Sequence, residues 1–442
     1  MVEKNTFVEI ENDVLSRIVP KKSAFPVVNV FVESLKKTAS KIGIDCRVVI
    51  GGSVAKDTYL DGDFDCDVFV RFNPQQLGKS HAVTSAVVVD EKIVSYLTQI
   101  VKKIAQTSGL AKNEIQLLHG SRDYYKITKD GITYELIPTL DVKNAAEAPN
   151  VTDMSLFHVD WVVTACKKNK KLSNEIRLAK AFCKGQGVYG AESYIGGFSG
   201  HVIDILVIYC GGFREFLKDS LTWQNKQIID VENHHAGKDA LSILNEAKLT
   251  SPIIVIDPIV SQRNAASALN KSCFEKFKLA ASAYLKNPSL GFFVNATFDF
   301  KSLAKLPGVT YVLHLVPQSD KKDIAGAQHV KVLEYICQQA RENDFAVVGS
   351  GWVWSADLSG DIYVRFERDK LSETHDLRGP PIAMTDAANK FRAAHLTIEV
   401  RTGCLWAAVA RKYPTVEKLF TALVAHELIK MRCKSFSWKK ID

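Results

Sequence analysis

The sequence lacks the features that mark several specialised classes of protein. No run of about 18 or more apolar residues occurs, so we expect no transmembrane segment. The first 13 residues mix acids with apolar side chains, whereas a secretory leader has a basic start and a continuous apolar core. Internal repeats and low-complexity segments are also missing, and 46% hydrophobic and 24% charged residues are typical of a folded globular chain. We therefore expect a cytoplasmic protein without a membrane partner.

The nine cysteines show no pattern that indicates a disulfide framework or a structural zinc site. They are odd in number and scattered along the chain, and no two have the close spacing of zinc ligands. Reduced thiols, as in a cytoplasmic protein, are therefore expected.

An excess of positive charge is present but small. Lysine and arginine number 57 against 49 acids, and the resulting net charge of +8 does not by itself establish a nucleic-acid partner. From Arg411 onward, eight basic and three acidic residues are interleaved with Tyr413, Phe420, Phe436 and Trp438. Such a mixture suits a surface that contacts phosphates and stacks on bases. A solvated amphipathic helix with a basic tail explains it equally well.

A chain of 442 residues favours about three domains. The hydrophobic pattern predicts an α/β unit over residues 1–150, a mostly helical unit over 151–289 and a second α/β unit over 290–442. The predicted helices cover residues 7–18, 28–42, 91–105, 173–187, 202–218 and 325–343, and the predicted strands cover 47–50, 65–72, 132–137, 309–316, 345–348 and 361–366. In the last unit the order strand, helix, strand, strand is typical of an RNA-recognition type of fold.

One stretch of the sequence carries a chemical pattern. Gly52 and Ser53 are followed, after a spacer of eleven residues, by Asp65 and Asp67 at the start of a predicted strand. Residues two apart on a strand point to the same face, so the two carboxylates should lie side by side, about 7 Å apart at the backbone. Carboxylates that close repel each other, and a divalent cation removes that cost. Such oxygen ligands suit Mg²⁺, and two ions would activate an attacking hydroxyl and stabilise a leaving pyrophosphate.

Two further features extend this pattern. Glu135 lies in an otherwise apolar predicted strand that Pro138 should end, and it is the candidate for a third metal ligand. The backbone at Gly52 can approach a ligand closely, so the amides there and the Ser53 hydroxyl can cradle phosphate oxygens. A glycine-serine pair alone is usually a turn, and an Asp-x-Asp pair alone is usually surface. The combination, at this spacing, is much rarer by chance.

The combination resembles the DNA polymerase β-type nucleotidyltransferase superfamily. The chain also resembles, over nearly its whole length, the archaeal-type (class I) CCA-adding enzymes, which are tRNA nucleotidyltransferases. The supporting stretches follow the family's order. They are Phe157-His158, Glu175-Ile-Arg177-Leu-Ala-Lys180, Gly187-Val-Tyr189-Gly190-Ala-Glu192, Gly197-Phe198-Ser199-Gly200, Ile229-Asp230-Val231, Asp257-Pro258, Arg263-Asn264-Ala265-Ala266, Pro288-Ser289-Leu290-Gly291-Phe292-Phe293 and Arg378-Gly379-Pro380-Pro381.

The resemblance implies a two-metal enzyme that adds C, C and A from CTP and ATP to the 3′ end of tRNA without a template. It assigns Asp65, Asp67 and Glu135 to two Mg²⁺ ions. The nucleotide-binding residues that it implies are Gly52, Ser53, Lys56, His158, Lys180, Tyr189 and Arg263. The arginine would face the base of the incoming nucleotide, because its fixed fork of donors can read acceptors on C or A.

The fold class that the resemblance implies is an α+β multidomain chain. Residues 1–150 would form a polymerase β-like nucleotidyltransferase head, residues 151–289 a helical neck and body that binds nucleotide, and residues 290–442 an RRM-like α/β tail. The tail would grip the acceptor and TΨC arms of tRNA. The sequence leaves open whether the chain forms a homodimer.

The chain departs from the family pattern at several positions. Glu135 stands where the family usually has Asp, Lys56 replaces a usual Arg, and Gly196 replaces a common basic residue. Without the resemblance, Lys180 would belong to an exposed basic helix face. Two other functions therefore stay open, namely a poly(A) or oligoadenylate-type polymerase and a catalytically impaired tRNA-binding relative.

Overall fold

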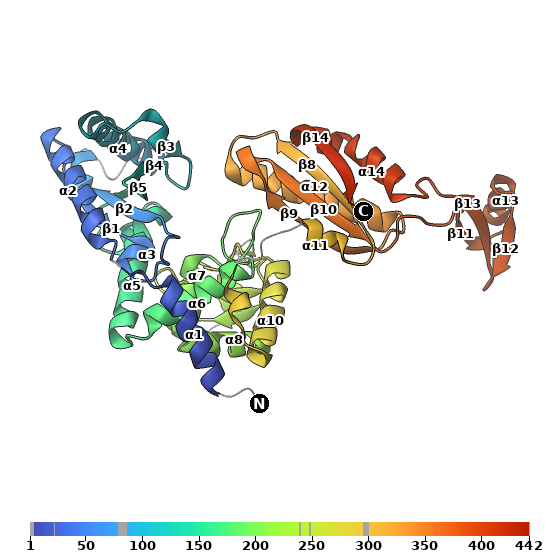
Figure 1. Cartoon of the computed structure of the whole chain (residues 1–442), viewed down its shortest axis with the longest axis horizontal. Coiled ribbons are helices and arrows are strands. Elements are labelled where there is room, and N and C mark those ends of the chain that lie inside the picture. Colours follow the sequence, from blue (N-terminus) through green and yellow to red (C-terminus); the bar gives the residue numbers. More distant parts are fainter. Residues whose placement is uncertain are drawn as a thin grey trace. The chain divides into compact units, whose positions relative to one another are not determined.

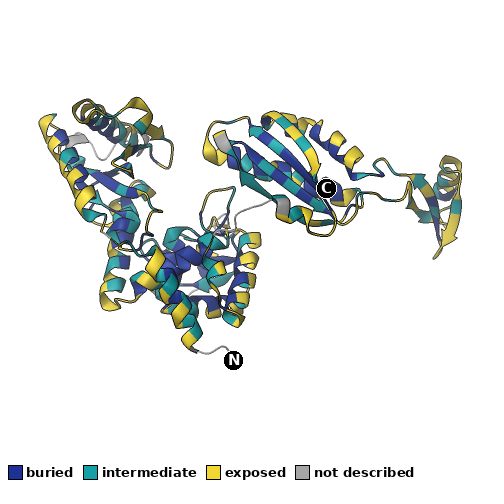
Figure 2. Cartoon of the chain, in the orientation of Figure 1, coloured by how far each residue is buried: buried dark blue, intermediate teal, exposed yellow. Residues whose placement is uncertain are grey.

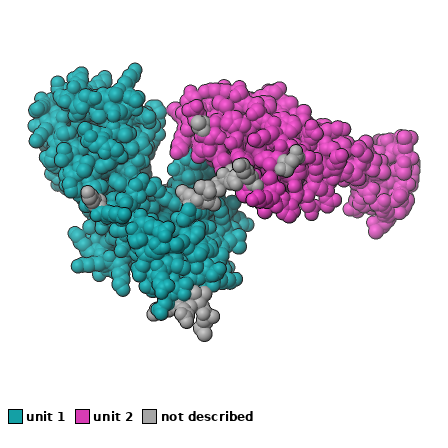
Figure 3. Space-filling model, in the orientation of Figure 1, with its two compact units in different colours: residues 1–296 teal, residues 297–442 magenta. Residues whose placement is uncertain are grey.

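The computed structural model describes residues 4–21, 23–77, 86–237, 240–246, 249–294 and 300–441. The chain divides into two compact units, residues 1–296 and residues 297–442 (Figure 3). In the described residues, no helix is long and apolar enough to cross a membrane. All nine cysteines are free thiols.

The first unit begins with a five-stranded sheet in the order β1-β2-β5-β4-β3 (Figure 1). Its strands are β1 (Cys46–Ile50), β2 (Cys66–Phe72), β3 (Ile115–Leu118), β4 (Tyr124–Lys129) and β5 (Ile132–Leu140). Strands β2 and β5 are parallel, and the other pairs are antiparallel. The prediction that Pro138 ends β5 is wrong, because the strand continues to Leu140 beside β2. Since β4 pairs with β5 only up to Leu136, Pro138 lies where a missing N–H is tolerated, as on an edge strand.

Two helices pack on this sheet and bury its apolar residues. They are α2 (Phe25–Lys41) and α4 (Ala86–Ser108), and the short helix α3 (Gly52–Ala55) follows β1. The apolar residues 93, 97, 100 and 104 of the predicted helix lie at helical spacing on α4, and all four side chains are buried. Figure 2 shows the same alternation on the sheet, where buried strand residues face the helices. The spacing of the apolar residues therefore predicted correctly which side of α4 faces this core.

The remainder of the first unit is mostly helical. Its helices are α5 (Ser155–Lys168), α6 (Leu172–Gly185), α7 (Gly200–Cys210), α8 (Phe213–Thr222), α9 (Ala240–Ile243) and α10 (Lys271–Lys286), and its strands are β6 (Gln227–Ile229) and β7 (Ile253–Val255), a parallel pair. The predicted single helix over residues 202–218 is wrong. It is two helices, because Gly211 has φ +87° and caps α7 in the left-handed conformation.

The N-terminal helix α1 (Lys4–Ile18) packs on the helical part rather than on the sheet. The Phe7 ring contacts the Tyr284 ring edge-on, with the centroids 5.6 Å apart, and Val14 is buried in the same core. Glu11 is buried at this contact, where it lies 3.1 Å from the Arg214 Nε and accepts a hydrogen bond from the Tyr284 hydroxyl. Burial raises the pKa of Glu11 to about 7, although Arg214 opposes the shift.

Replacing Glu11 with Gln is expected to stabilise the protein at pH 8 and to have little effect at pH 4. A carboxyl group whose pKa is raised by folding contributes stability below its unfolded pKa of 4.5 and loses that contribution as the pH rises through about 7. The difference between the two pH values should therefore reach up to about 3 kcal/mol. Urea unfolding of Glu11→Gln measures it. Glu9→Gln, at an exposed position of α1, is the control, and equal effects of Glu11→Gln at both pH values would contradict the prediction.

The second unit contains a four-stranded antiparallel sheet in the order β14-β8-β10-β9. Its elements are α11 (Phe300–Ala304), β8 (Val309–Pro317), α12 (Lys322–Glu342), β9 (Val347–Trp354), β10 (Gly360–Phe366), α14 (Val416–Val424), α15 (Glu427–Lys430) and β14 (Cys433–Ile441). The strand predicted over residues 345–348 instead runs from Val347 to Trp354, because the Trp-rich segment pairs with β10. Helices α12 and α14 contribute to one core with the sheet.

A smaller antiparallel sheet is inserted between β10 and α14. It has the order β11-β13-β12 and consists of β11 (Thr374–Pro381), α13 (Thr385–Ala394), β12 (Ile398–Arg401) and β13 (Cys404–Ala410). This insertion was not anticipated from the sequence. The segment carries Arg378, whose motif was singled out, on strand β11.

Candidate active site

Two of the predicted metal ligands lie side by side on the parallel strands of the first sheet. Asp67 on β2 is the register partner of Glu135 on β5. Asp65 immediately precedes β2, one residue before the strand begins. Lys126 on β4 is the register partner of Glu135 on the other side, and its Nζ lies 3.0 Å from the Asp65 Oδ2 and 3.7 Å from the Glu135 Oε1. The Lys126 ammonium therefore lies near two of the three acids, Asp65 and Glu135, and Asp67 is the register partner of Glu135.

The ionisation of these acids is disfavoured in the absence of a further cation. Burial raises the pKa of Asp67 to about 6; the Lys56 charge opposes this shift, and repulsion from Asp65 adds to it. Burial, together with repulsion from Asp67, raises the pKa of Glu135 to about 7, although Lys126 lowers it. One ammonium group therefore does not compensate the clustered negative charge. A set of carboxylate oxygens with excess negative charge fits a hard divalent cation.

The glycine before the candidate phosphate-binding serine is held against the carboxylate site. Gly52 has φ +55°, a conformation that favours glycine, and a Cβ built there would lie 1.6 Å from the Asp67 Oδ2. The Gly51 amide donates a hydrogen bond to the Asp67 carbonyl oxygen at 2.8 Å. The backbone of the glycine-serine stretch and the Asp67 carboxylate are thus in direct contact, which no side chain at position 52 would permit.

A cavity of about 580 Å³ extends from these acids to the helical part of the same unit. Strand and loop residues line it from the sheet, and helix residues line it from the other side. The predicted site residues in its lining are Gly52, Ser53, Lys56, Asp65, Asp67, Lys180 and Tyr189. The lining also includes residues that were not predicted, among them Lys184, His201 and Asp204. Seven of the predicted residues are thus brought to one cavity from distant parts of the chain.

Two lysines in the cavity share one buried carboxylate. Asp204 on α7 is 1% exposed, and its Oδ2 lies 2.8 Å from the Lys56 Nζ, whereas its Oδ1 lies 3.5 Å from the Lys180 Nζ. Burial lowers the pKa of Lys180, an effect that the Asp204 charge opposes. The Lys180 Nζ also donates to the Thr58 hydroxyl at 2.9 Å. Because Lys180 is 4% exposed, its assignment to an exposed basic helix face is wrong.

Tyr189, the aromatic residue of the predicted set, lines the cavity together with these lysines. The Lys184 ammonium lies over the Tyr189 ring, 4.8 Å from its centroid. A Cβ at Gly200 would lie 3.0 Å from the Tyr189 hydroxyl, so this glycine permits the close approach. The cation on the ring face adds positive charge to the same side of the cavity.

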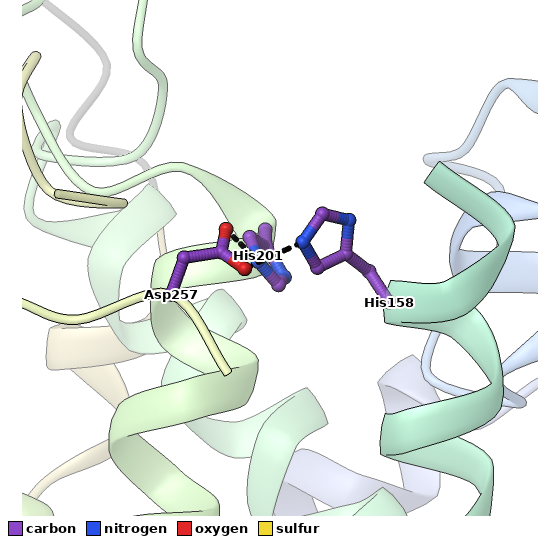
Figure 4. A group of neighbouring side chains, drawn as sticks. All are labelled: His158, His201 and Asp257. Carbon is purple, nitrogen blue, oxygen red and sulfur yellow. Dashed lines mark hydrogen bonds and ion pairs between the residues drawn. The ribbon is translucent and has the colours of Figure 1, made fainter. Parts of the chain in front are cut away.

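Three predicted residues are not in the cavity lining. Glu135 is the register partner of Asp67, and His158 and Arg263 are brought together at a separate point of the first unit. Both contact Asp257, which is fully buried (Figure 4). The His158 Nε2 lies 2.8 Å from the Asp257 Oδ1, and the Arg263 Nη1 donates to its Oδ2 at 2.9 Å. His201 packs against His158 with ring centroids 4.3 Å apart and also lines the cavity. His158 and Arg263 therefore do not line the cavity, and His201 connects the two groups.

Besides Lys184, sequence reasoning missed four charged or ionisable residues whose contacts organise these groups. They are Lys126, His201, Asp204 and Asp257. A signal existed for Asp204, since it is an acid in an apolar helix segment, the same argument that identified Glu135. Asp257 belongs to a stretch that carried the family resemblance, but no role was attached to it. Lys126 and His201 carry no signal of their own, because only their tertiary contacts distinguish them from other basic residues.

About two thirds of the chain has the same fold as solved structures that the comparison finds. The terminal uridylyl transferase Cid1 superposes with a TM-score of 0.51 at 12% identity, over 67% of this chain and 100% of that one. A second Cid1 structure, described as a poly(U) polymerase, gives a TM-score of 0.50 at 12% identity, over 66% of this chain and all of that one. At this identity the likeness concerns the fold alone. The acid cluster and the cavity belong to the part of the chain whose function the sequence comparisons address.

The sequence comparisons identify the family to which the chain belongs. Residues 174–294 match the family described as tRNA nucleotidyltransferase, second domain. The CCA-adding enzyme of Nanoarchaeum equitans is 31% identical over 379 residues, which is 85% of this chain and 84% of that protein. Those of Methanosarcina barkeri and Methanocaldococcus jannaschii are 27% and 26% identical, over 93% and 95% of this chain and 88% and 91% of theirs. The chain belongs to the CCA-adding enzyme family, and the predicted resemblance to the archaeal-type enzymes is confirmed.

The prediction of an enzyme of nucleotidyl transfer is thereby confirmed as well. The poly(A) or oligoadenylate-type alternative is not favoured, because the relatives found over most of the chain are named CCA-adding enzymes. The assignment of individual residues to metal, phosphate and base remains a prediction.

Proposed function

We propose that this protein extends the 3′ end of tRNA with C, C and A, taken from CTP and ATP, without a nucleic-acid template. One observation carries the proposal. Asp65 and Asp67 line a cavity that is also lined by Lys56 and the buried Lys180, and Glu135 is the register partner of Asp67. A nucleoside triphosphate with its metal ions needs this arrangement, with negative charge at the metal end and positive charge at the phosphate end.

Asp65, Asp67 and Glu135 are the residues that would hold two Mg²⁺ ions. The donor set fits, because three carboxylates are clustered at the ends of β2 and β5, and mutual repulsion adds to the burial that raises the pKa of Asp67 and of Glu135. When bound, the ions would supply a Lewis acid for the attacking 3′ hydroxyl and charge stabilisation for the leaving pyrophosphate. The protein's own contribution is to hold the carboxylates on adjacent rigid strands.

The phosphate groups would be bound by residues from both walls of the cavity. Backbone amides at Gly52 and the Ser53 hydroxyl approach from the sheet, and Lys180 and Tyr189 approach from the helical part. The Lys56 ammonium is a compact single charge that would neutralise phosphate charge. The Arg that is usual in the family would instead bind a phosphate through two N–H donors. This convergence would position the α-phosphate for attack, which is the main protein contribution in such transfers.

The base would be read by Arg263, whose side chain remains 42% exposed although one of its nitrogens is bound to Asp257. His158 would act at the same end of the nucleotide, through the same carboxylate. Arginine keeps further donors free for acceptors on C or A when one nitrogen is anchored.

The division into a catalytic head of residues 1–150, a helical part of 151–289 and a tail of 290–442 is part of the proposal. Support for the RRM-like tail comes from the chain order β8, α12, β9, β10, α14, β14 and the sheet order β14-β8-β10-β9. Helix α1 belongs by its contacts to the helical part. The tail would bind the acceptor and TΨC arms of tRNA. The expectation that Phe420 belongs to a base-stacking surface is wrong, because its side chain is fully buried, and Tyr413, Phe436 and Trp438 are partly buried against the same core.

Extension of a tRNA that lacks its 3′ CCA tests the proposal. The reaction contains Mg²⁺ and each labelled triphosphate, separately and together. Addition of two C and one A, and then arrest, is expected. A long A tract would move the protein to the poly(A) polymerase class. Binding of tRNA without metal-dependent extension would identify a catalytically impaired relative.

The length of the third acid provides a further prediction. Glu135→Asp is expected to retain incorporation within about tenfold, because the shorter side chain keeps the charge on β5, whereas Glu135→Ala should lose about 100-fold or more. Both are measured as the single-turnover rate of C addition across a Mg²⁺ titration. The Asp variant should require more Mg²⁺ but recover at saturation. If both variants were equally active, Glu135 would not be a metal ligand.

A further inference from the structure

The buried carboxylate of Asp257 has an unusually full set of donors. Its Oδ1 accepts from the His158 Nε2 at 2.8 Å and from the backbone amides of Ile259 and Val260 at 2.9 and 3.1 Å. Its Oδ2 accepts from the Arg263 Nη1 at 2.9 Å. Although burial alone would raise the pKa of Asp257, the hydrogen bond from His158 and the nearby His201 ring hold it well below its usual range. Asp257 therefore stays charged.

The loop from Asp257 to Arg263 is closed by its own backbone as well. The Asp257 amide donates to the Arg263 carbonyl oxygen at 3.0 Å, and the Arg263 amide donates to the Val260 carbonyl oxygen at 2.8 Å. Both ends of the loop and the guanidinium are thus tied to one residue. An exposed arginine normally samples many rotamers, and an anchor at one nitrogen removes much of that freedom.

The same carboxylate also reaches the cavity. The His201 Nε2 lies 3.4 Å from the Asp257 Oδ2, and His201 lines the cavity beside Asp204. Burial lowers the pKa of His201 to about 4, so that this ring is neutral at pH 7. A continuous set of contacts therefore runs from Arg263 through Asp257 and His201 to the wall of the cavity. Figure 4 shows Asp257 with His201 and His158.

We propose that Asp257 is a positioning residue that sets the orientation of the Arg263 guanidinium relative to the triphosphate cavity, and that nucleotide selectivity depends on it. This inference rests on the proposed function, in which Arg263 reads the base. Asp257 does not touch the nucleotide and acts through Arg263. Its contact with His201, which lines the cavity, fixes the position of the Arg263 guanidinium relative to the residues that would bind the phosphates.

A metal ion is the other arrangement that these side chains suggest. Ligand atoms of His158, His201 and Asp257 lie within 4.8 Å of one another, which suits a transition metal. The Asp257 oxygens, however, already accept two backbone amides and a guanidinium. A metal would have to displace bonds that close the loop, and it would sit beside a permanent positive charge. The hydrogen-bonded arrangement therefore accounts better for the geometry.

The ratio of kcat/KM for CTP to that for UTP, on tRNA that lacks CCA, tests the inference. Asp257→Asn keeps the shape and removes the charge, and it is expected to lower this ratio roughly 10- to 100-fold, the range for a charged hydrogen bond. Asp257→Glu, the second variant, keeps the charge but moves it by one methylene, and it should lower the ratio less. Arg263→Lys should lower the ratio as much as Asp257→Asn, and the double variant Asp257→Asn/Arg263→Lys should lower it no further.

Asp153→Asn is the matched control. Asp153 is also a buried carboxylate paired with an arginine, Arg122, at a position outside the cavity. Asp153→Asn should lower Tm and leave the ratio of kcat/KM for CTP to that for UTP unchanged, because partial unfolding reduces the rates with both nucleotides equally.

Each remaining outcome has a defined meaning. If Arg263→Lys lowered the ratio and neither Asp257 variant did, the inference would be overturned and the proposed function would stand. If none of these variants lowered it, the assignment of Arg263 as base reader would fail and the inference with it. One zinc ion per chain in the purified protein, lost in His158→Ala, would overturn the hydrogen-bonded arrangement.

Discussion

Asp67→Asn is expected to lose nucleotide incorporation by at least about 1,000-fold while its affinity for tRNA stays nearly unchanged. Asp67 lies between Asp65 and Glu135, is the register partner of Glu135 and contacts the backbone of the phosphate-binding stretch. An amide of the same shape preserves the packing but removes one negative charge from the metal site. The single-turnover rate of C addition at saturating CTP measures the loss, and a gel shift with the same tRNA measures binding.

The control for this variant lies at the other end of the same strands. Asp141 directly follows β5, and its carboxylate forms an ion pair with Arg71 at 2.8 Å. Its amide bonds to the carbonyl oxygen of Phe72, the last residue of β2, so it lies about 16 Å from the Asp67 end by strand rise. Asp141→Asn removes the same charge and should keep the rate within about threefold. Incorporation by Asp67→Asn near the parent rate would rule out Asp67 as a metal ligand.

Gly52→Ala is expected to reduce incorporation by about 100-fold or more, although only one methyl group is added. The new Cβ would lie 1.6 Å from the Asp67 Oδ2, so either the carboxylate or the glycine-serine stretch must move. A displacement of about 1 Å at a metal ligand is enough for a loss of this size. The rate of C addition across a Mg²⁺ titration is the measurement, and a higher Mg²⁺ requirement is expected along with the lower rate.

A second glycine separates the steric clash from backbone strain. Gly43 has φ +72°, also left-handed, and a Cβ there would meet nothing within 4 Å. Gly43→Ala should therefore destabilise the protein by about 1 kcal/mol and leave the incorporation rate unchanged. If Gly52→Ala behaved like Gly43→Ala, the Asp67 carboxylate would not be confined as the structure has it.

Much of the first sheet and its helices could be predicted because their determinants are local. The apolar period of residues 91–105 required a helix, and the alternation after Asp65 required a strand with Asp65 and Asp67 on one side. The errors occurred where neighbours decided the outcome. Strand β5 continues past Pro138 because β2 pairs with it there, and the inserted sheet β11-β13-β12 depends on pairing between strands that are separated by a helix.

In the candidate site, too, the residues could be proposed from local patterns, whereas their contacts could not. Asp67 and Glu135 could be proposed separately, but their register pairing across parallel strands could not, because nothing local sets the alignment of β2 with β5. Asp204 lies almost 150 residues beyond Lys56, and only the tertiary structure brings its Oδ2 to 2.8 Å from the Lys56 Nζ. Asp257 and His201 became notable for the same reason.

The sequence by itself determined the class of chemistry, because the glycine-serine pair and the spaced acids are short-range patterns whose residue types already limit what they can bind. It also determined the family, since the motifs occur in order along the chain. The tertiary structure alone decided which cations face those acids, which carboxylate anchors Arg263 and where the cavity lies. Such contacts join residues far apart in the chain, and their energies depend on burial and distance, which no local pattern encodes.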